Sequence, residues 1–303
     1  MNKVLITGGS GLIGTAMTKL LTQQGFEVAW LSRASKNSSE AKIFLWNIET
    51  NFLDEEAIKW ANIIIHLAGE NIADKRWTPK RKRKIIESRT CSAQLLIEKI
   101  KLFPGNIKTV VAASAIGYYG DRKNEILNEN APAGSGFLSA SVAAWENATG
   151  EFEKLNVRLV RLRIGVVLSE HGGAFKELMQ LSPLRILPKL GKGTQIYSWI
   201  HIADVCGIIL FAIINNLSGI YNAVAPKPVS QITLVKTIKN ISGKFYLIVP
   251  APALALKIYL GELSTAVLIS QYVSSDKIQN AGYRFEFERI EGAIKLIIEK
   301  SKK

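Results

Sequence analysis

A glycine-rich turn near the start of the chain constrains the fold more than any other stretch. Residues 6–14 read ITGGSGLIG, with glycines at Gly-x-x-Gly-x-x-Gly spacing, after an apolar run at 3–7 and before a helical pattern at 12–25. In a strand–turn–helix unit, such glycines allow a tight turn and let a pyrophosphate approach the free N–H groups of the helix. The pattern favours a dinucleotide site over a structural turn. We expect the cofactor to contact Gly8, Gly11, Leu12, Ile13 and Gly14.

The end of the second predicted strand, FEVAWLSR (26–33), indicates which dinucleotide binds. An NAD site usually has an acid about 20 residues after the glycines. This strand instead ends in Ser32 and Arg33, Lys36 follows, and no carboxylate occurs between Glu27 and Glu40. A hydroxyl and a planar cation suit the 2′-phosphate of NADP(H), and the arginine can also stack on adenine. We predict NADP(H); a solvated arginine at a strand end is the alternative.

Strand and helix patterns alternate through the first half of the chain. Further β-branched strands are expected at 62–69, 107–115 and 157–165, with helices at about 79–101 and 136–155. This alternation predicts an α/β fold with a doubly wound parallel Rossmann sheet.

The alternation loosens after residue 165, which predicts a smaller α/β C-terminal domain. The 303 residues suffice for two domains, and 48% hydrophobic with 21% charged residues is an ordinary globular composition. The expected bounds are 1–165 for the NADP-binding Rossmann domain, with a return segment at about 195–225, and 166–303 for the substrate or lid domain.

Cysteine and histidine usage argues against disulfides and metals. Cys91 and Cys206 lie far apart, and the three histidines are scattered, so we expect no metal site. The chain enters a strand directly, and its longest apolar run, 205–214, is too short to span a bilayer. The later apolar stretch 251–269 is expected to be a packed helix. We expect a cytoplasmic protein with no membrane partner.

A basic run, KRWTPKRKRK (75–84), raises the question of nucleic-acid binding. It carries seven cationic side chains in a chain whose net charge is +14, and such a patch attracts phosphates without reading sequence. The sequence contains no helix-turn-helix, zinc finger or sheet with paired aromatic residues. We interpret the run as the solvated face of a helix that begins at Pro79, and we expect no specific nucleic-acid partner.

Several motifs resemble the extended short-chain dehydrogenase/reductase superfamily. They are TGGSGLIG, HLAGENI (66–72) and SAIGYYG (114–120). Others narrow the resemblance to an atypical branch, the NAD(P)-dependent nucleoside-diphosphate-sugar epimerase-like family with its own short C-terminal domain. These are FLSASVAAWE (137–146), RIGVVLS (163–169), GTQIYSWIHIADV (193–205), YNAVAP (221–226) and AGYRF (281–285).

The resemblance implies a Rossmann fold and NADP binding, and adds residues to the expected cofactor site. It implies that Arg89 reaches the cofactor phosphates, and that Glu70 and Asn71 lie near the cofactor and substrate. Arg163 ends the fifth strand, at the edge where ligands collect in doubly wound sheets, so a phosphate contact is expected there too. The remaining expected contacts come from Leu67, Ala68 and Gly69.

The chain departs from the superfamily in its catalytic pair. The superfamily uses Tyr-x-x-x-Lys on the helix after the fourth strand, and alignment on Glu146 puts Leu138 and Val142 at those positions. Residues 120–155 contain no tyrosine. The remaining candidates for proton transfer are Ser114 and Tyr118, with Tyr119 beside it; the alternative is that both rings only pack the loop.

His201 and Asp204 resemble a catalytic dyad, but Asp204 is expected to cap the helix that begins at Val205, the commoner use of such a residue. The resulting hypothesis is an NADP-dependent oxidoreductase or epimerase-like enzyme acting on an unknown, anionic small molecule. An NADP(H)-binding sensor or scaffold with little turnover is the alternative, and nucleic-acid association through 75–84 is less favoured. A monomer and a homodimer both remain open.

Overall fold

The computed structural model describes residues 2–34 and 41–301, and its centre is an eight-stranded sheet of order β13-β8-β6-β5-β1-β2-β3-β4. All neighbours pair in parallel except β3 and β4. The predicted doubly wound Rossmann sheet is confirmed. Its strands are β1 (Lys3–Thr7), β2 (Glu27–Ser32), β3 (Lys42–Asn47), β4 (Phe52–Leu53), β5 (Ile63–His66), β6 (Thr109–Ala115), β8 (Arg158–Ile164) and β13 (Gly219–Ala223).

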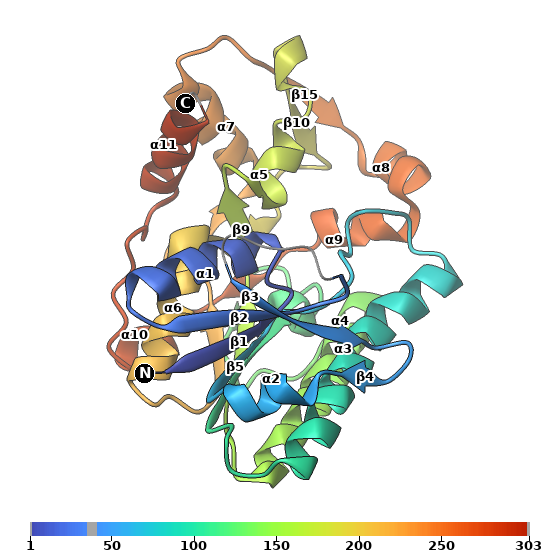
Figure 1. The fold of residues 1–303 in the computed structure, drawn as a ribbon. Helices are drawn as coiled ribbons and strands as arrows, with labels where there is room; N and C mark the ends of the chain where they lie inside the picture. Colours follow the sequence, from blue (N-terminus) through green and yellow to red (C-terminus); the bar gives the residue numbers. More distant parts are fainter. Residues whose placement is uncertain (1, 35–40, 302–303) are drawn as a thin grey trace.

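Helices cover both faces of this sheet (Figure 1). Alternate residues of β1 point to opposite faces, so Val4 and Ile6 pack in one core cluster and Leu5 in the other. The first cluster also holds side chains of α1 (Leu12–Gln23) and α6 (Ile202–Ile214), and the second those of α2 (Glu55–Trp60) and α3 (Pro79–Leu102). Helix α4 (Gly136–Gly150) packs beside α3.

The strand order reverses at β1, which lies between β2 and β5. Thr7 at the end of β1 is level with Leu31 on one side and His66 on the other. Three carboxyl ends therefore meet at one edge, and in open α/β sheets ligands bind at this reversal.

The C-terminal region has its own core, formed by Trp199, Leu234, Ile294 and other buried residues. Strand β13 returns from this part of the chain to the main sheet beside β8; the expected domain bounds themselves stay a prediction. The further elements are β7 (Ile126–Leu127), β9 (Val166–Ser169), α5 (Gly173–Leu178), β10 (Ile186–Leu190), β11 (Ile196–Tyr197), β12 (Trp199–His201), β14 (Val229–Ser230), α7 (Gln231–Ser242), β15 (Leu247–Ala251), α8 (Ala253–Leu260), α9 (Ser264–Leu268), β16 (Tyr272–Val273), α10 (Asp276–Asn280) and α11 (Ile290–Lys300).

The stretch 251–269 is not the single packed helix that its sequence suggests. Helix α8 ends at Leu260, because Gly261 takes a positive φ of 62°, and α9 begins at Ser264. None of the side chains of α8 is buried. Among the described residues, no helix combines the length and the apolar character needed to cross a bilayer.

Candidate functional site

The glycine loop after β1 is closed so tightly that side chains would not fit. Gly8 has a φ of +71°, which favours glycine, and a Cβ on it would lie 3.1 Å from the carbonyl of Leu67. A Cβ on Gly14 would lie 2.3 Å from the carbonyl oxygen of Gly8. A Cβ on Gly9 would meet the ring of Trp30 at 2.3 Å. Glycine is therefore required at these positions, because the loop packs tightly on itself, on the end of β5 and on β2.

The start of α1 is suited to hold an anion. Gly11 is its N-cap residue and offers no side-chain cap, and the first turn has no acidic residue. The N–H groups of Leu12 and Ile13, together with the positive end of the helix dipole, remain available to a pyrophosphate. A glycine cradle of this shape fits a dinucleotide.

The end of β2 lies at the same edge. Ser32 is half-buried and Arg33 is exposed, and the Ser32 hydroxyl accepts a hydrogen bond from the backbone N–H of Ala34 at 3.3 Å. Lys36 lies outside the described residues. A hydroxyl and a cation thus stand next to the glycine loop, as a 2′-phosphate site requires.

The end of β5 is held by a polar network that the sequence did not reveal. The Thr7 hydroxyl accepts from the N–H groups of Leu67 and Ala68 at 3.1 and 3.0 Å, and lies 2.8 Å from His66 Nδ1. Its single proton therefore points to Nδ1, which leaves Nε2–H of His66 to face Ser92 Oγ at 3.3 Å. Burial first, then the nearby cation of Arg89, lowers the pKa of His66 to about 4.

Arg89 lies across Gly69, beside this edge. It donates to the carbonyl oxygens of Ile85 and Glu70 at 2.9 and 3.0 Å and lies 4.9 Å from the centre of the Trp145 ring. A Cβ on Gly69 would come within 3.0 Å of its guanidinium carbon. Burial lowers the pKa of Arg89 to about 10, so it stays charged at neutral pH. Its expected contact with cofactor phosphates stays a prediction.

Glu70, just past Gly69, receives part of the basic run. Its carboxylate pairs with Arg81 at 2.6 Å and with Lys84 at 3.4 Å. These cations lower the pKa of Glu70 against the opposing effect of burial, which is the largest single influence. The neighbouring Asn71 bonds through its backbone carbonyl to Arg81 at 2.5 Å. Two cations of the basic run, Arg81 and Lys84, therefore form ion pairs within the protein.

A buried ion pair lies at the ends of β6 and β8. Arg163 donates to both carboxylate oxygens of Glu146, each at 2.8 Å, and Ser114 Oγ donates to the same carboxylate at 2.5 Å. Arg163 is only 2% exposed. All three of its guanidinium nitrogens bond to protein atoms, so the expected phosphate contact of Arg163 is not part of the proposed cofactor site.

Two tyrosines complete this cluster. Tyr119 accepts from Arg163 at 2.9 Å and donates to Asn222 Oδ1 at 2.7 Å, and burial raises its pKa. The half-buried Tyr118 ring lies over the guanidinium of Arg163, and the distance from the ring centre to the guanidinium carbon is 3.6 Å. The structure thus brings the candidates Ser114 and Tyr118 to one place. Asn222 was not among the residues expected at the site, and Glu146 served only to align the helix.

The positions of the missing catalytic pair face the same turn. A Cβ on Gly117, in the 3-10 turn Ile116–Tyr119, would lie 2.9 Å from the Leu138 side chain and 3.6 Å from that of Val142. Both side chains are hydrocarbon and pack on the turn that carries Tyr118. Neither can transfer a proton.

The expected cap role of Asp204 is wrong. Helix α6 begins at Ile202, because β12 ends one residue earlier, and its N-cap is His201, whose Nδ1 accepts from the N–H of Ala203 at 3.2 Å. Asp204 instead accepts from the Tyr283 hydroxyl at 2.9 Å and from two backbone N–H groups, of Glu286 and Phe287, at 2.8 and 3.1 Å. It holds the segment before α11 against α6.

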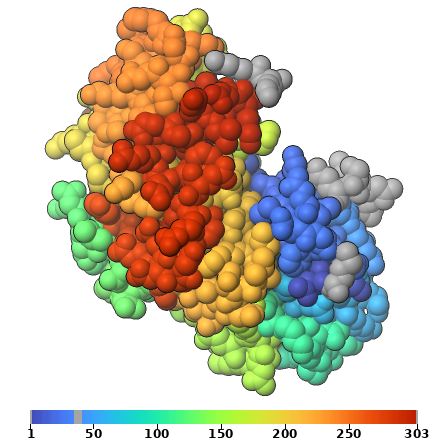
Figure 2. Space-filling model, turned by 90° about the vertical axis from the view of Figure 1, so that its left-hand side faces the viewer, coloured from blue at the N-terminus to red at the C-terminus, as the bar shows by residue number. Residues whose placement is uncertain are grey.

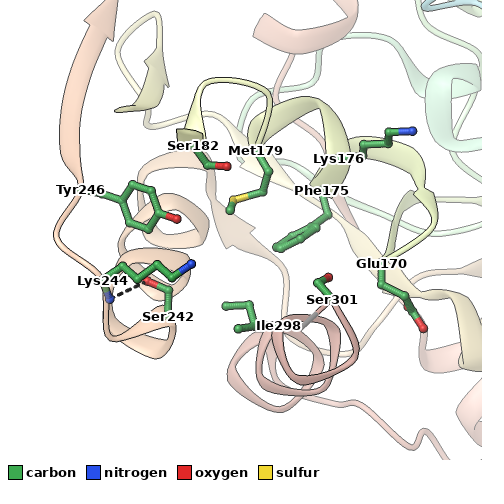
Figure 3. Close-up of a pocket in the computed structure, with 10 residues that line it drawn as sticks. All are labelled: Glu170, Phe175, Lys176, Met179, Ser182, Ser242, Lys244, Tyr246, Ile298 and Ser301. Carbon is green, nitrogen blue, oxygen red and sulfur yellow. Dashed lines mark hydrogen bonds between the residues drawn. The ribbon is translucent and has the colours of Figure 1, made fainter. Parts of the chain in front are cut away.

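Two hollows adjoin the C-terminal region. An open groove of about 1120 Å³ runs from Gly11 along α1 and α6 to Tyr283; Figure 2 shows this side, with the segment 276–301 in red beside α6 and α1. A smaller cavity of about 270 Å³ lies between α5, α11 and the loop after α7, with Tyr246 and Lys244 facing Phe175 and Met179 (Figure 3). In the described part of the chain, no three His, Cys, Asp or Glu side chains form a group suited to a metal ion.

Comparison with known proteins places this geometry in context. A model of the NAD dependent epimerase/dehydratase family matches residues 4–223, and a model of a domain of unknown function, DUF1731, matches residues 251–297. The chain is 34% identical to "Epimerase family protein SAB0724c" of Staphylococcus aureus over 99% of its length and 100% of the relative.

Two solved structures are also similar. One is that of the human epimerase family protein SDR39U1 with NADPH, with a TM-score of 0.87, 30% identity, and coverage of 98% of this chain and 99% of the other. The second is a nucleoside-diphosphate sugar epimerase from Corynebacterium glutamicum, with a TM-score of 0.77 and 31% identity. That alignment covers 97% of this chain and 57% of the other.

Proposed function

Because the chain belongs to the NAD dependent epimerase/dehydratase family, we propose that it binds NADP(H) and acts as an oxidoreductase or epimerase on an anionic small molecule. The observation that carries this proposal is the glycine cradle at the start of α1, with Ser32 and Arg33 at the same sheet edge. The NADPH of the human relative supports the choice of cofactor.

Each part of the cofactor has a proposed partner. The N–H groups of Leu12 and Ile13 bind the pyrophosphate, while Gly8, Gly11 and Gly14 let it approach. Ser32 and Arg33 bind the 2′-phosphate. The backbone at Leu67, Ala68 and Gly69 lines the cofactor, because Thr7 holds it beside the glycine loop, and Arg89 supplies a cation. When bound, the nicotinamide gives or accepts a hydride.

Proton transfer falls to the cluster at the end of β6. We propose Ser114 and Tyr118 as the groups that face the substrate, with Glu146 and Arg163 as positioning residues. The Glu146 carboxylate fixes the Ser114 hydroxyl, and the Arg163 guanidinium fixes the Tyr118 ring. The name of the Corynebacterium relative supports a nucleotide sugar as the class of substrate.

Turnover on common sugar nucleotides should be slow. General acid–base help typically contributes 10²–10⁴-fold, and the hydrocarbon side chains of Leu138 and Val142 occupy the positions of the usual pair. For the same reason we keep a second function, an NADP(H)-binding sensor or scaffold with little turnover.

One experiment separates the two functions. Purified protein with NADPH or NADP⁺ is mixed with a panel of nucleotide sugars, while cofactor absorbance and sugar epimerisation are followed. An enzyme changes absorbance or epimerises at least one sugar, and Ser114→Ala/Tyr118→Phe should abolish that change. Tight NADPH binding without any turnover would support the sensor, and the absence of NADPH binding would refute both.

Introducing the superfamily's tyrosine and lysine at positions 138 and 142 tests the role of the missing catalytic pair. Leu138→Tyr/Val142→Lys should not restore brisk epimerisation, because both positions pack on the turn at Gly117 and shape the pocket there. The rate is compared with wild type and with the single variants. Brisk wild-type epimerisation that survives Ser114→Ala/Tyr118→Phe would contradict this account.

A further inference from the structure

Helix α8 exposes three large apolar side chains. Leu254, Ile258 and Tyr259 are 71, 69 and 79% exposed, and no residue of this helix is buried. Leu254 and Ile258 are four residues apart and therefore share one face of the helix. Contiguous exposed apolar residues on a folded protein commonly mark a site of interaction.

The basic run lies directly beside this helix. Arg76 Nη2 donates to the backbone carbonyl of Ile258 at 3.2 Å, and Lys82 forms an ion pair with Glu262. Trp77 packs with Leu263 and Leu260 in a small shared core. Figure 1 shows the loop that leads into α3 next to the α8–α9 segment. The two stretches that sequence reasoning treated separately therefore form one continuous surface.

We call this surface the basic–apolar face. Its apolar part is Leu254, Ile258 and Tyr259, and its exposed cations are Lys75, Arg76, Lys80 and Lys257. Two acids adjoin it: Glu262, which pairs with Lys82, and Asp74, which accepts a hydrogen bond from the Asn71 side chain. Exposed cations thus outnumber exposed acids on the two contacting segments that form the face, on a chain of net charge +14.

We propose that the basic–apolar face docks on an anionic lipid surface, with α8 lying in the interface. Apolar side chains that enter the headgroup region, surrounded by cations that attract anionic headgroups, are typical of peripheral membrane contacts. Such docking needs no membrane-spanning helix, and it departs from the sequence-based expectation that the protein has no membrane partner. It is independent of the proposed reaction.

Charge and shape argue against the other occupants. A nucleic acid would use the cations but would leave Leu254 and Ile258 in water. A second copy joined by a two-fold axis would bring the same cations of both protomers together, and like charges oppose that contact. An anionic bilayer can bind both the apolar side chains and the cations of the face.

The test is co-sedimentation of the full chain with lipid vesicles. One set contains phosphatidylcholine alone, and the other contains phosphatidylcholine with an equal amount of phosphatidylserine. Wild-type protein should bind the anionic vesicles and release them at high salt. Lys75→Gln/Lys80→Gln should weaken binding about 30-fold, from the usual contribution of each cation near such a surface.

A second variant tests the apolar part. Leu254→Ser/Ile258→Ser should weaken vesicle binding by about 10-fold or more. Matched controls are Lys101→Gln/Lys295→Gln, which removes two exposed lysines elsewhere, and Leu102→Ser, at the other end of α3, where Leu102 is 62% exposed. Both controls should bind vesicles as wild type does, and all variants should keep their far-UV CD spectrum and their NADPH affinity.

Three outcomes would overturn the proposal. Wild-type protein that binds neither vesicle, or both equally well, shows no anionic lipid docking. Binding to DNA that survives Leu254→Ser/Ile258→Ser, without vesicle binding, would assign the cations to nucleic acid. A concentration-dependent dimer that this variant dissociates, again without vesicle binding, would assign the face to a second copy. NADPH binding measured in the same samples keeps these results separate from the fate of the proposed function.

Discussion

Single residues at the sheet edge explain most of the proposed chemistry. Glycines are required where a Cβ would collide with backbone, as at Gly14, and Thr7 places the peptide groups of Leu67 and Ala68 beside them. In the proposed site, Ser32 and Arg33 add the two groups that would distinguish a 2′-phosphate from a 2′-hydroxyl. We therefore expect these two adjacent side chains to determine the choice of cofactor.

The first prediction concerns Arg33. Charge-assisted hydrogen bonds contribute about 1.5–3 kcal/mol, so Arg33→Ala should weaken NADPH binding about 10- to 100-fold and leave NADH binding nearly unchanged. Fluorescence titration measures both affinities. The control Arg83→Ala removes an exposed arginine of α3, which faces Glu87 at 3.8 Å, and should leave both unchanged. Wild-type protein that binds NADH as tightly as NADPH would contradict the reading of Ser32 and Arg33.

The second prediction concerns the buried pair. Glu146→Gln leaves the Arg163 charge buried without its partner, and such a loss commonly costs about 3 kcal/mol or more. Urea unfolding should show it as a lower midpoint. The control is Glu153→Gln, whose carboxylate pairs with Arg161 at 2.9 Å but is 55% exposed, so its loss should cost less than about 1 kcal/mol. Equal effects from the two variants would refute the structural role of Glu146.

Helices and strands lie where the sequence predicts them when the signal comes from residues close together along the chain. The helix expected at 79–101 is α3, Pro79–Leu102, and the Thr78 side chain caps it by accepting from the N–H of Arg81. Strand β3 was not expected, although four of the six residues of its sequence, KIFLWN, are apolar; near the edge of the sheet only Phe44 and Trp46 of this strand are buried. The start of α6 was misplaced, because the chain turns directly from β12 into the helix.

The third prediction tests the contact between α6 and the segment before α11. Asp204→Asn keeps the shape of the side chain but loses charge-assisted bonds from Tyr283 and two backbone N–H groups. We expect about 2–3 kcal/mol lower stability. Tyr283→Phe removes one of the bonds and should cost about 1 kcal/mol. If Asp204→Asn costs no more than Tyr283→Phe, the two backbone bonds contribute little.

For the molecule as a whole, two buried histidines predict a pH dependence of stability. Burial lowers the pKa of both His66 and His201 to about 4, below the ordinary 6.5. Between these pH values the unfolded chain binds protons that the folded protein does not. The contribution of these histidines to the free energy of unfolding is therefore fully present above about pH 6.5 and is lost as the pH falls towards 4. The change for His66 alone is about 3 kcal/mol.

Urea midpoints measured across this pH range give the test. His66→Gln should flatten the pH slope. Because the variant also changes the contacts of His66 with Thr7 and Ser92, the slope and not the midpoint is compared. His171→Gln changes a side chain that is 80% exposed and should leave the slope as in wild type. A slope that His66→Gln does not change would assign the loss at low pH to other groups.

The sequence alone determined the features that depend on neighbours along the chain. The glycine spacing, the alternation of strand and helix, the helix start at Pro79 and the absence of an acid after β2 are all local. They predicted the Rossmann sheet and the residues proposed to hold the cofactor. Each could be found from sequence because tight turns and helix starts restrict which residue types fit within a few positions.

Only the tertiary structure decided which distant side chains meet. Tyr119 bonds to Asn222, 103 residues away, and Arg76 contacts the carbonyl of Ile258, 182 residues away. The periodic pattern of a sequence does not reveal contacts between residues so far apart. The partners of Asp204, the burial of Arg163 and the exposure of α8 likewise depend on which surfaces pack together. The chain's own pattern sets how each element forms, whereas packing sets what each element leaves exposed for a partner.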